Sequence, residues 1–288
     1  MQLGVEMSLR DARPTRLQLG SAVMAMLLIF SVGWGTAYHW NNGAASFNVA
    51  ATTPTPPAGG APKKVMPLGD SLTDGYNIPG GYRTDLWNKV ITDGLSIDFV
   101  GSLTNGPASL PDRNHEGHSG WRIDEIAAEV IPWLTAAQPD IVLLMIGTND
   151  MAQDYNRATA PDRLSALIDR IAATRPTAQV IVASIPRLRG SPGADWVQSY
   201  NATIPSIIEA KAAQGRRVSY VDVYGVVTDS DLHSDLTHLN ASGNSKVANV
   251  WYSAIRPILS SDGSSASTPT ATPTSTPPTP PSATAPVA

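Results

Sequence analysis

Ile141-Val-Leu-Leu-Met-Ile146 is an unbroken apolar run, and this stretch decides the fold class of the chain. A short apolar segment that is closed by a glycine, here Gly147, is typical of a parallel strand covered by helices on both faces. Four other short segments of the chain are also predicted to be strands. They are Lys64–Leu68, Ile97–Val100, Val180–Ser184 and Val218–Val223.

Segments with helical periodicity separate these predicted strands. Their apolar residues recur every three or four positions, as Ile123, Ile126 and Val130 do in one of them. The predicted helices are Tyr82–Thr92, Trp121–Leu134, Pro161–Thr174, Trp196–Gln214 and Ala241–Leu259. Strands that alternate with helices predict an α/β fold, in which helices cover both faces of a parallel sheet.

Residues 1–45 have the pattern of an export signal. Three arginines precede an apolar stretch that runs from Leu17 to about Tyr38. That stretch is also close to the length of a membrane-spanning helix, so an uncleaved signal anchor is the alternative to cleavage after Ala45 or Ala51. No charged residue follows until Lys63, which places the rest of the chain outside the cytoplasm. We expect a protein that is secreted, or held at the outer face of the plasma membrane by its N-terminal segment.

Two segments rich in proline and small residues flank the part that we expect to fold. Residues 46–62 and 261–288 have too few apolar side chains to offset the entropy of ordering. We interpret the first as a linker and the second as a disordered tail. Residues 63–260 remain, and their length suits one α/β domain.

The composition excludes several classes of protein. The chain has 20 basic and 24 acidic residues, a net charge of -4, and contains no run of Lys or Arg. Nucleic-acid-binding proteins normally carry a basic stripe, so we expect no nucleic-acid partner. The chain has no cysteine. Disulfides, thiolate metal sites and a cysteine nucleophile are therefore impossible within it.

Polar loops follow three of the predicted strands. The carboxyl ends of parallel strands meet at one edge of a sheet, where functional groups collect. Ser71 follows the first predicted strand, and Asp235-Leu-Thr-His238 follows the last. A serine nucleophile needs a base, a group that orients the base, and donors for an oxyanion. His238 and Asp235 supply the first two residue types, and the N–H of Gly120 and the amide of Asn149 could supply the donors.

Other polar residues compete for these roles. Ser119 also follows a glycine-containing turn, but its surroundings lack the Gly-x-Ser-x-Gly spacing, and we expect it to shape the loop that presents Gly120. The segment Asp112–His118 contains two histidines and two acids, which suggests a metal site. A third well-placed ligand is missing, so we predict a polar loop and no metal. Asp70, beside Ser71, is expected to be a structural hydrogen-bonding residue.

Several aromatic residues lie in or near the same loops. Trp121 directly follows Gly120, so its ring either borders the site, where it could stack on a sugar, or packs on the core. Tyr76, Tyr82 and Tyr155 carry the same two interpretations.

Four ordered blocks of the chain resemble the GDSL, or SGNH, hydrolases. They are Gly69-Asp-Ser-Leu72, Gly120, Gly147-Thr-Asn-Asp150 and Asp235-x-x-His238. Three longer strings are similar to the acetyl xylan esterases of carbohydrate esterase family 3. These strings are Met66–Gly75, Pro79-Gly-Gly-Tyr-Arg83 and Gly117-His-Ser-Gly-Trp-Arg-Ile-Asp124.

The resemblance implies a role for each matching residue. It assigns Ser71 as the nucleophile, His238 as the general base and acid, and Asp235 as the residue that orients His238. The oxyanion hole consists of the N–H groups of Ser71 and Gly120 with the amide of Asn149. The implied fold is a flavodoxin-like three-layer α/β/α sandwich with a five-stranded parallel sheet, and the implied chemistry needs no metal or other cofactor.

These features predict an exported serine esterase. Its substrate is an acylated carbohydrate or another small ester, most simply an acetyl ester on a polysaccharide such as xylan. A lipase or lysophospholipase of the same superfamily is one alternative. A non-catalytic carbohydrate-binding or wall-attached module and a sugar O-acetyltransferase are alternatives from other classes. The sequence carries no signal for the oligomeric state.

Overall fold

The computed structural model describes residues 61–261, so the predicted export signal, most of the predicted linker and the tail from residue 262 lie outside the described residues. The strands are β1 Lys63–Gly69, β2 Ile97–Phe99, β3 Leu103–Thr104, β4 Asn114–Gly117, β5 Ile141–Met145, β6 Gln179–Ala183 and β7 Val218–Val221. The α-helices are α1 Ser71–Asp74, α2 Gly81–Thr92, α3 Ile123–Ala137, α4 Thr148–Ala152, α5 Ala160–Thr174, α6 Ala194–Ala213 and α7 Ala241–Ser261. Two short 3-10 helices are η1 Arg157–Thr159 and η2 Asp229–Asp231.

The sheet is mostly parallel, and β1 lies in its interior. The strand order is β3-β4-β1-β5-β6-β7, and β2 pairs with the first residues of β1 while β4 pairs with its last. Strands β2 to β4 thus lie on one side of β1, and β5 and the strands after it lie on the other. In open α/β sheets, ligands bind outside the carboxyl ends of the strands at such a reversal of order. The ends of β1 and β5 are therefore where the fold places a site.

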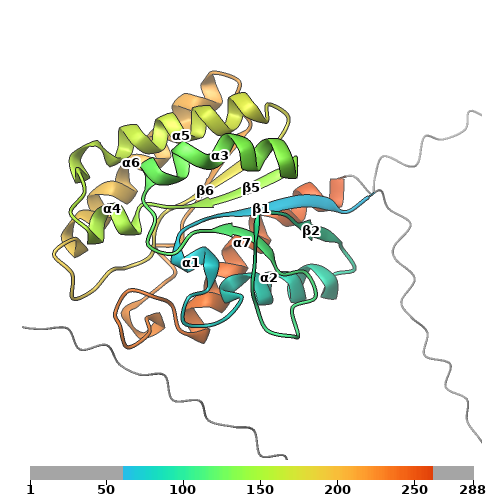
Figure 1. Ribbon diagram of the computed structural model, residues 1–288, viewed down its shortest axis with the longest axis horizontal. Helices are drawn as coiled ribbons and strands as arrows, with labels where there is room; N and C mark the ends of the chain where they lie inside the picture. Colours follow the sequence, from blue (N-terminus) through green and yellow to red (C-terminus); the bar gives the residue numbers. More distant parts are fainter. Residues whose placement is uncertain (1–60, 262–288) are drawn as a thin grey trace, which may run out of the picture. The chain divides into compact units, whose positions relative to one another are not determined.

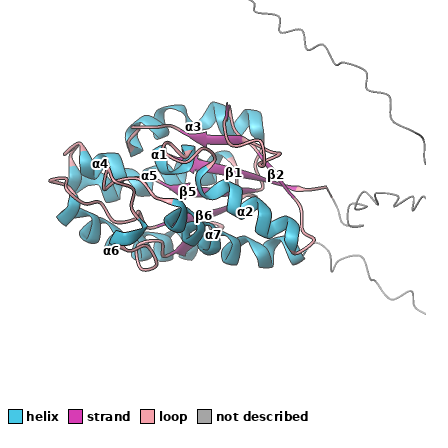
Figure 2. Ribbon diagram, turned by 90° about the horizontal axis from the view of Figure 1, so that it is seen from below, coloured by secondary structure: helices cyan, strands magenta, loops and turns pink. Residues whose placement is uncertain are grey.

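Helices cover both faces of this sheet, α3, α5 and α6 on one face and α2 and α7 on the other (Figures 1 and 2). Strand β5 shows how the sequence achieves this. Its side chains alternate between the faces, so that Val142 and Leu144 pack under α3 and α5 while Leu143 and Met145 pack under α2 and α7. All five residues of β5 are buried, which is why the run contains no polar position. The predicted three-layer α/β/α sandwich is confirmed.

The expected number of five strands is wrong, because the described residues form seven. The additional strands, β3 and β4, are two and four residues long and pair antiparallel. Strand β4 reads Asn-His-Glu-Gly, so no apolar run marks it in the sequence. Its last three residues are nevertheless buried. The Glu116 carboxylate is bonded to Ser102 and His118, and His115 Nδ1 accepts the Gly117 N–H.

The five predicted helices are present with shifted ends, and two further short ones appear. Helices α1 and α4 contain four and five residues, too few to show a helical period. Both begin at polar blocks that end a strand. Helix α3 begins at Ile123, so Trp121, which was predicted to open this helix, lies in the loop before it.

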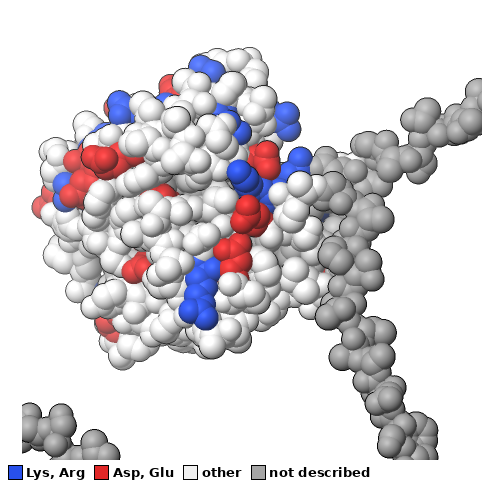
Figure 3. Space-filling model, turned by 45° about the vertical axis from the view of Figure 1, so that its right-hand side comes forward, with Lys and Arg blue, Asp and Glu red and all other residues white. Residues whose placement is uncertain are grey.

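The surface of the described domain carries charges of both signs. On the face shown in Figure 3, Lys and Arg stand in small groups mixed with Asp and Glu, among a larger uncharged area. Within residues 61–261, none of the helices combines the length and apolar character required to cross a membrane.

Candidate active site

Ser71 is the first residue of α1, and the sharp turn between β1 and α1 positions it. The side chain of Asp70, directly before it, accepts a hydrogen bond from the Leu72 N–H at 3.0 Å and so caps the short helix. Only 6% of Ser71 is exposed. The turn holds its hydroxyl against a loop that lies far away in the sequence.

A hydrogen-bonded chain links Ser71, His238 and Asp235. Ser71 Oγ lies 2.8 Å from His238 Nε2, and His238 Nδ1 lies 2.8 Å from Asp235 Oδ2. The ionised carboxylate of Asp235 can only accept a hydrogen bond, so Nδ1 of His238 carries the hydrogen that is donated to it. Nε2 then faces the Ser71 hydroxyl as a free base. The structure therefore brings together three residues from two loops in the arrangement that a serine nucleophile requires.

The surroundings of Asp235 keep its carboxylate ionised. Oδ1 accepts the N–H groups of Thr237 at 3.1 Å and His238 at 2.9 Å, and Oδ2 also accepts the amide of Asn77 at 2.5 Å. Partial burial alone raises the pKa of this carboxyl, but these hydrogen bonds outweigh it and hold the pKa of Asp235 well below its ordinary value. Ionised Asp235 can stabilise the positive charge that forms on His238 when it takes a proton.

Asn77 is a site residue that the sequence did not reveal. It lies between α1 and α2 and reaches Asp235 across 158 positions of the chain. An asparagine in a loop between glycines usually indicates only a turn. No local pattern distinguishes Asn77 from such a residue, because its partner is defined by the fold.

The loop after β4 is fastened to the element that carries Ser71. The His118 N–H donates to the Gly69 carbonyl at 2.9 Å, at the end of β1. The Ser119 hydroxyl donates to Asp74 Oδ2 at 2.6 Å, at the end of α1. Ser119 therefore holds the loop in place, and its hydroxyl is committed to Asp74.

This loop also binds α4, which carries Asn149. The amide of Asn149 donates to the Trp121 carbonyl and that of Gln153 to the Gly120 carbonyl, each at 2.9 Å. Gly120 has φ +83°, a conformation that favours glycine, and nothing lies within 4 Å of the position that a Cβ would take. Asn149 retains a second amide hydrogen, the kind of donor that stabilises an oxyanion. Two of the three predicted donors, Gly120 and Asn149, thus come from segments that are hydrogen-bonded to each other.

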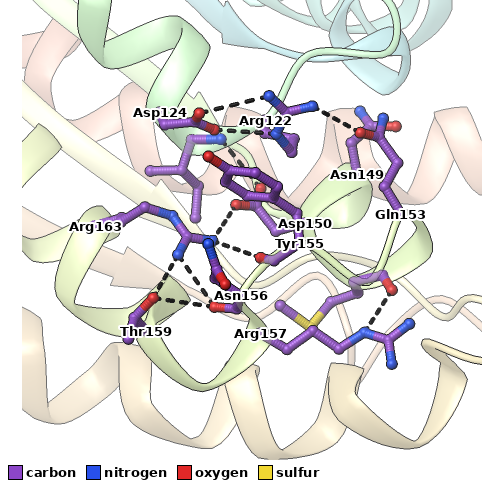
Figure 4. A network of polar contacts seen from close by, with 12 residues as sticks. Arg122, Asp124, Asn149, Asp150, Gln153, Tyr155, Asn156, Arg157, Thr159 and Arg163 are labelled. Carbon is purple, nitrogen blue, oxygen red and sulfur yellow. Dashed lines mark hydrogen bonds and ion pairs between the residues drawn. The ribbon is translucent and has the colours of Figure 1, made fainter.

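A polar network holds α4 in place behind the site (Figure 4). Asp150, next to Asn149, is buried and accepts hydrogen bonds from Arg163 at 2.6 Å and from the first N–H of α3 at 3.1 Å. Burial raises the pKa of Asp150, and its bond with Arg163 opposes that rise. Arg122 donates to Gln153 at 2.8 Å. In the block that follows β5, the side chain of Asn149 is therefore presented to the site, while that of Asp150 anchors α4.

The buried guanidinium of Arg83 anchors the far end of α1. It donates to the carbonyls of Thr73 at 3.1 Å and Asp74 at 3.2 Å, and also to those of Asn105 and Arg113. Burial lowers the pKa of Arg83 to about 10, so the group stays charged at neutral pH. These bonds fix the short helix that carries Ser71 to the loops around β3 and β4.

Asp70 differs from Asp235 in its electrostatic environment. It is completely buried, and desolvation raises the pKa of Asp70 to about 7 although the Leu72 N–H opposes the rise. Its role in the structure is to cap α1.

The ring of Trp121 packs inside the loop. His118 is stacked between Trp121 and Trp133, with ring centroids 4.4 Å apart in each pair, and His118 Nε2 lies 2.8 Å from the buried Glu116. Trp121 is half-buried and contacts the core beneath α3. The suggested stacking of a sugar on Trp121 stays a prediction.

The polar residues of the segment 112–118 have partners within the protein. The ring of His115 accepts the Gly117 N–H at 3.1 Å, and Asp112 accepts the Phe99 N–H. In the described part of the chain, no group of three or more histidines and acids is placed to hold a metal ion.

Asn149→Ala is expected to lower kcat by about 10²–10³, the usual loss when one oxyanion donor is removed. KM should change little, because the amide acts mainly on the charge that develops during the reaction. Steady-state kinetics on a small acetyl ester measures both constants.

Gln153→Ala is the matched control, since it also removes an amide that bonds the end of α4 to the loop after β4, which contains Gly120. We expect it to lower kcat by no more than a few-fold. An equal loss in the two variants would mean that Asn149 acts only by holding the loop.

Several known proteins are similar to this chain in sequence and in architecture. Residues 68–246 match the sequence model of the GDSL-like lipase/acylhydrolase family. The chain is 30% identical over 238 residues to a multidomain esterase of Ruminococcus flavefaciens, an overlap of 72% of this chain but 30% of that protein. The solved structure of a family 3 carbohydrate esterase of Clostridium thermocellum is 40% identical, with a TM-score of 0.64 and coverage of 70% of this chain and 98% of that one. A family 3 carbohydrate esterase from Talaromyces cellulolyticus is 28% identical, with a TM-score of 0.62 and coverage of 69% and 99%.

Proposed function

The chain belongs to the GDSL-like lipase/acylhydrolase family, and from that premise we propose that it is an exported serine esterase that removes short acyl groups, chiefly acetyl, from a polysaccharide such as xylan. The observation that carries this proposal is the hydrogen-bonded chain from Ser71 through His238 to Asp235. The likeness to two family 3 carbohydrate esterases supports a carbohydrate ester as the substrate.

In the first half of the reaction, Ser71 Oγ attacks the ester carbonyl carbon while its proton passes to His238 Nε2. The carbonyl oxygen becomes an oxyanion, which accepts hydrogen bonds from the N–H groups of Ser71 and Gly120 and from Asn149. When this intermediate collapses, the bond to the sugar oxygen breaks and that oxygen takes the proton from His238. The acyl group stays on Ser71 as an ester.

In the second half, water replaces the sugar alcohol. His238 removes a proton from the water as it attacks the acyl carbon, and the same donors stabilise the second oxyanion. Collapse breaks the bond to Ser71 Oγ, which regains its proton from His238. The products are a carboxylic acid and the free enzyme, and no metal or redox step is needed for the balance.

The hollow beside the nucleophile is small. It is lined by Ser71 with neighbours that include Leu72, Ile78 and Leu239, and its volume is about 10 Å³. That is roughly the space of one water molecule. A fatty-acyl chain would need a far larger displacement of these lining side chains than an acetyl group, which favours an acetyl esterase over a lipase.

The N-terminal pattern supports the location that the proposed substrate requires. A polysaccharide esterase must work outside the cytoplasm, and the basic residues followed by an apolar stretch are typical of export. A non-catalytic binding module has no need for a serine, an imidazole and a carboxylate in one hydrogen-bonded chain.

The proposal predicts hydrolysis with a sharp preference for short acyl groups. The specificity constant, kcat/KM, for p-nitrophenyl acetate should exceed that for the palmitate ester by at least about 100-fold, and acetylated xylan should release free acetate. Product analysis by mass spectrometry and an acetate assay measures this outcome. A preference for palmitate would indicate a lipase, acetyl groups recovered on an added sugar would indicate a transferase, and no product at all would indicate a binding module.

A further inference from the structure

We infer that Tyr76 forms the platform for the sugar ring on the alcohol side of the ester, an inference that rests on the proposed esterase function. Tyr76 lies in the loop between α1 and α2 and is 64% exposed, the most exposed large apolar or aromatic residue of the described chain. Single exposed apolar residues are common on protein surfaces. The position of Tyr76 beside the reacting atoms is what gives its exposure meaning.

The ring of Tyr76 packs against the imidazole of His238. Their centroids lie 5.0 Å apart and the planes are inclined by 32°. Tyr76 also lines the hollow beside Ser71. The phenol ring therefore borders both the nucleophile and the base, while most of its surface remains open to solvent.

Two hydrogen bonds fix the loop around this exposed ring. The Tyr76 N–H donates to the Ser71 carbonyl at 3.2 Å. The next residue, Asn77, donates to Asp235 at 2.5 Å. The loop that carries the ring is thus tethered on one side to α1, which carries the nucleophile, and on the other to Asp235. A surface held in place before binding loses less entropy when a ligand settles on it.

The proton transfer determines which half of the substrate lies beside this ring. His238 Nε2 must reach the leaving oxygen to protonate it, at about 2.6–3.2 Å. The sugar ring that carries this oxygen therefore lies next to the imidazole, which is where Tyr76 stands. An aromatic face can pack on the C–H face of a pyranose, and a phenol hydroxyl can bond a sugar hydroxyl.

The other candidates near the site are less suited to this role. Trp121 already has the ring of His118 stacked on it. Leu236 is 45% exposed in the loop of His238, but it is aliphatic and has no flat face. Tyr76 is thus the exposed aromatic residue in contact with the base.

The test compares two acetyl esters that differ in their alcohol half. Acetylated xylobiose carries the sugar, whereas ethyl acetate carries no ring. We expect Tyr76→Ala to lower kcat/KM for acetylated xylobiose at least tenfold more than that for ethyl acetate, mainly through KM. Tyr76→Phe should keep most of the preference for the sugar ester, because it retains the ring. Acetate release followed in a pH-stat measures all of these constants.

Tyr252→Ala is the control for loss of a tyrosine, since that residue bonds Asp93 at the far end of α2, and it should not alter the ratio of the two specificity constants. Equal losses on both esters in Tyr76→Ala would overturn the inference and leave Tyr76 as a residue that only positions His238. An equal loss of preference in Tyr76→Phe would also overturn it, since the hydroxyl and not the ring would then carry recognition. If the unmodified protein hydrolyses ethyl acetate but no sugar ester, both the inference and the proposed substrate fail.

Discussion

Ser71→Ala should reduce ester hydrolysis by about 10⁴–10⁶ in kcat. Without Oγ no acyl-enzyme forms, and His238 has no hydroxyl to deprotonate. The free energy of unfolding should change by no more than about 1.5 kcal/mol, because the substitution removes one hydrogen bond, to His238, and no packing group larger than a hydroxyl. Stopped assays with p-nitrophenyl acetate and thermal unfolding by circular dichroism measure the two quantities.

Ser119→Ala is the matched control for this experiment. Ser119 is the other serine with a claim to be the nucleophile, but its hydroxyl donates to Asp74 at 2.6 Å. Loss of this hydroxyl should loosen the loop after β4 and lower activity only modestly. Full activity in Ser71→Ala, or complete inactivity in Ser119→Ala with Ser71 intact, would contradict the proposed mechanism.

Asp235→Asn should lower kcat by about 10²–10⁴. An asparagine amide can donate to His238 Nδ1, which moves the imidazole hydrogen to Nε2 and leaves no free base facing Ser71. It also removes the negative charge that balances protonated His238. The kcat of the variant, measured on p-nitrophenyl acetate at neutral pH, tests this expectation.

The pKa of Asp235 adds a pH dependence to this substitution. Because the folded-state pKa of Asp235 lies well below the ordinary value near 3.9, ionised Asp235 contributes its full stabilisation above that pH. This contribution declines progressively as the pH falls from there and is lost only once the pH passes through the lower folded-state pKa. The stability difference between the protein and Asp235→Asn should therefore shrink on acidification through pH 4. Thermal unfolding of both proteins at pH 7, pH 4 and pH 2 measures this progressive decrease.

Asp229→Asn is the control for removal of a carboxylate near this loop. Asp229 forms an exposed ion pair with Arg189 at 3.1 Å, and such pairs contribute little. It should leave kcat unchanged. If Asp235→Asn also kept full activity, the orientation of His238 would have to come from another group.

The fold class could be predicted because its evidence is local. An apolar run such as Ile141–Ile146 has no polar position, and a run this short that ends at a glycine is typical of a strand buried on both faces. The two strands that were missed show the limit of this evidence. In β4 the buried residues include His115 and Glu116, whose burial depends on partners such as Ser102, which bonds Glu116. Local polarity therefore indicated a loop where the folded chain forms a strand.

The candidate site divides in the same way. Ser71, Asn149, Asp235 and His238 stand in short blocks whose residue types and order are visible in the sequence, although their roles stay predictions. Asn77 could not be found there, since its hydrogen bond to Asp235 spans 158 positions.

The residue blocks and the alternation of strands with helices are properties of neighbouring residues. The sequence by itself therefore specifies the α/β class and the residue types available at the strand ends. Which of those groups meet depends on distances between loops, and these depend on the order of β1, β5 and β7 in the sheet. Ser71 and His238 stand 167 positions apart and come within 2.8 Å because parallel strands end at one edge. The exposed ring of Tyr76 beside His238 is likewise a consequence of folding, because exposure and contact are defined only once the sheet and its loops are assembled.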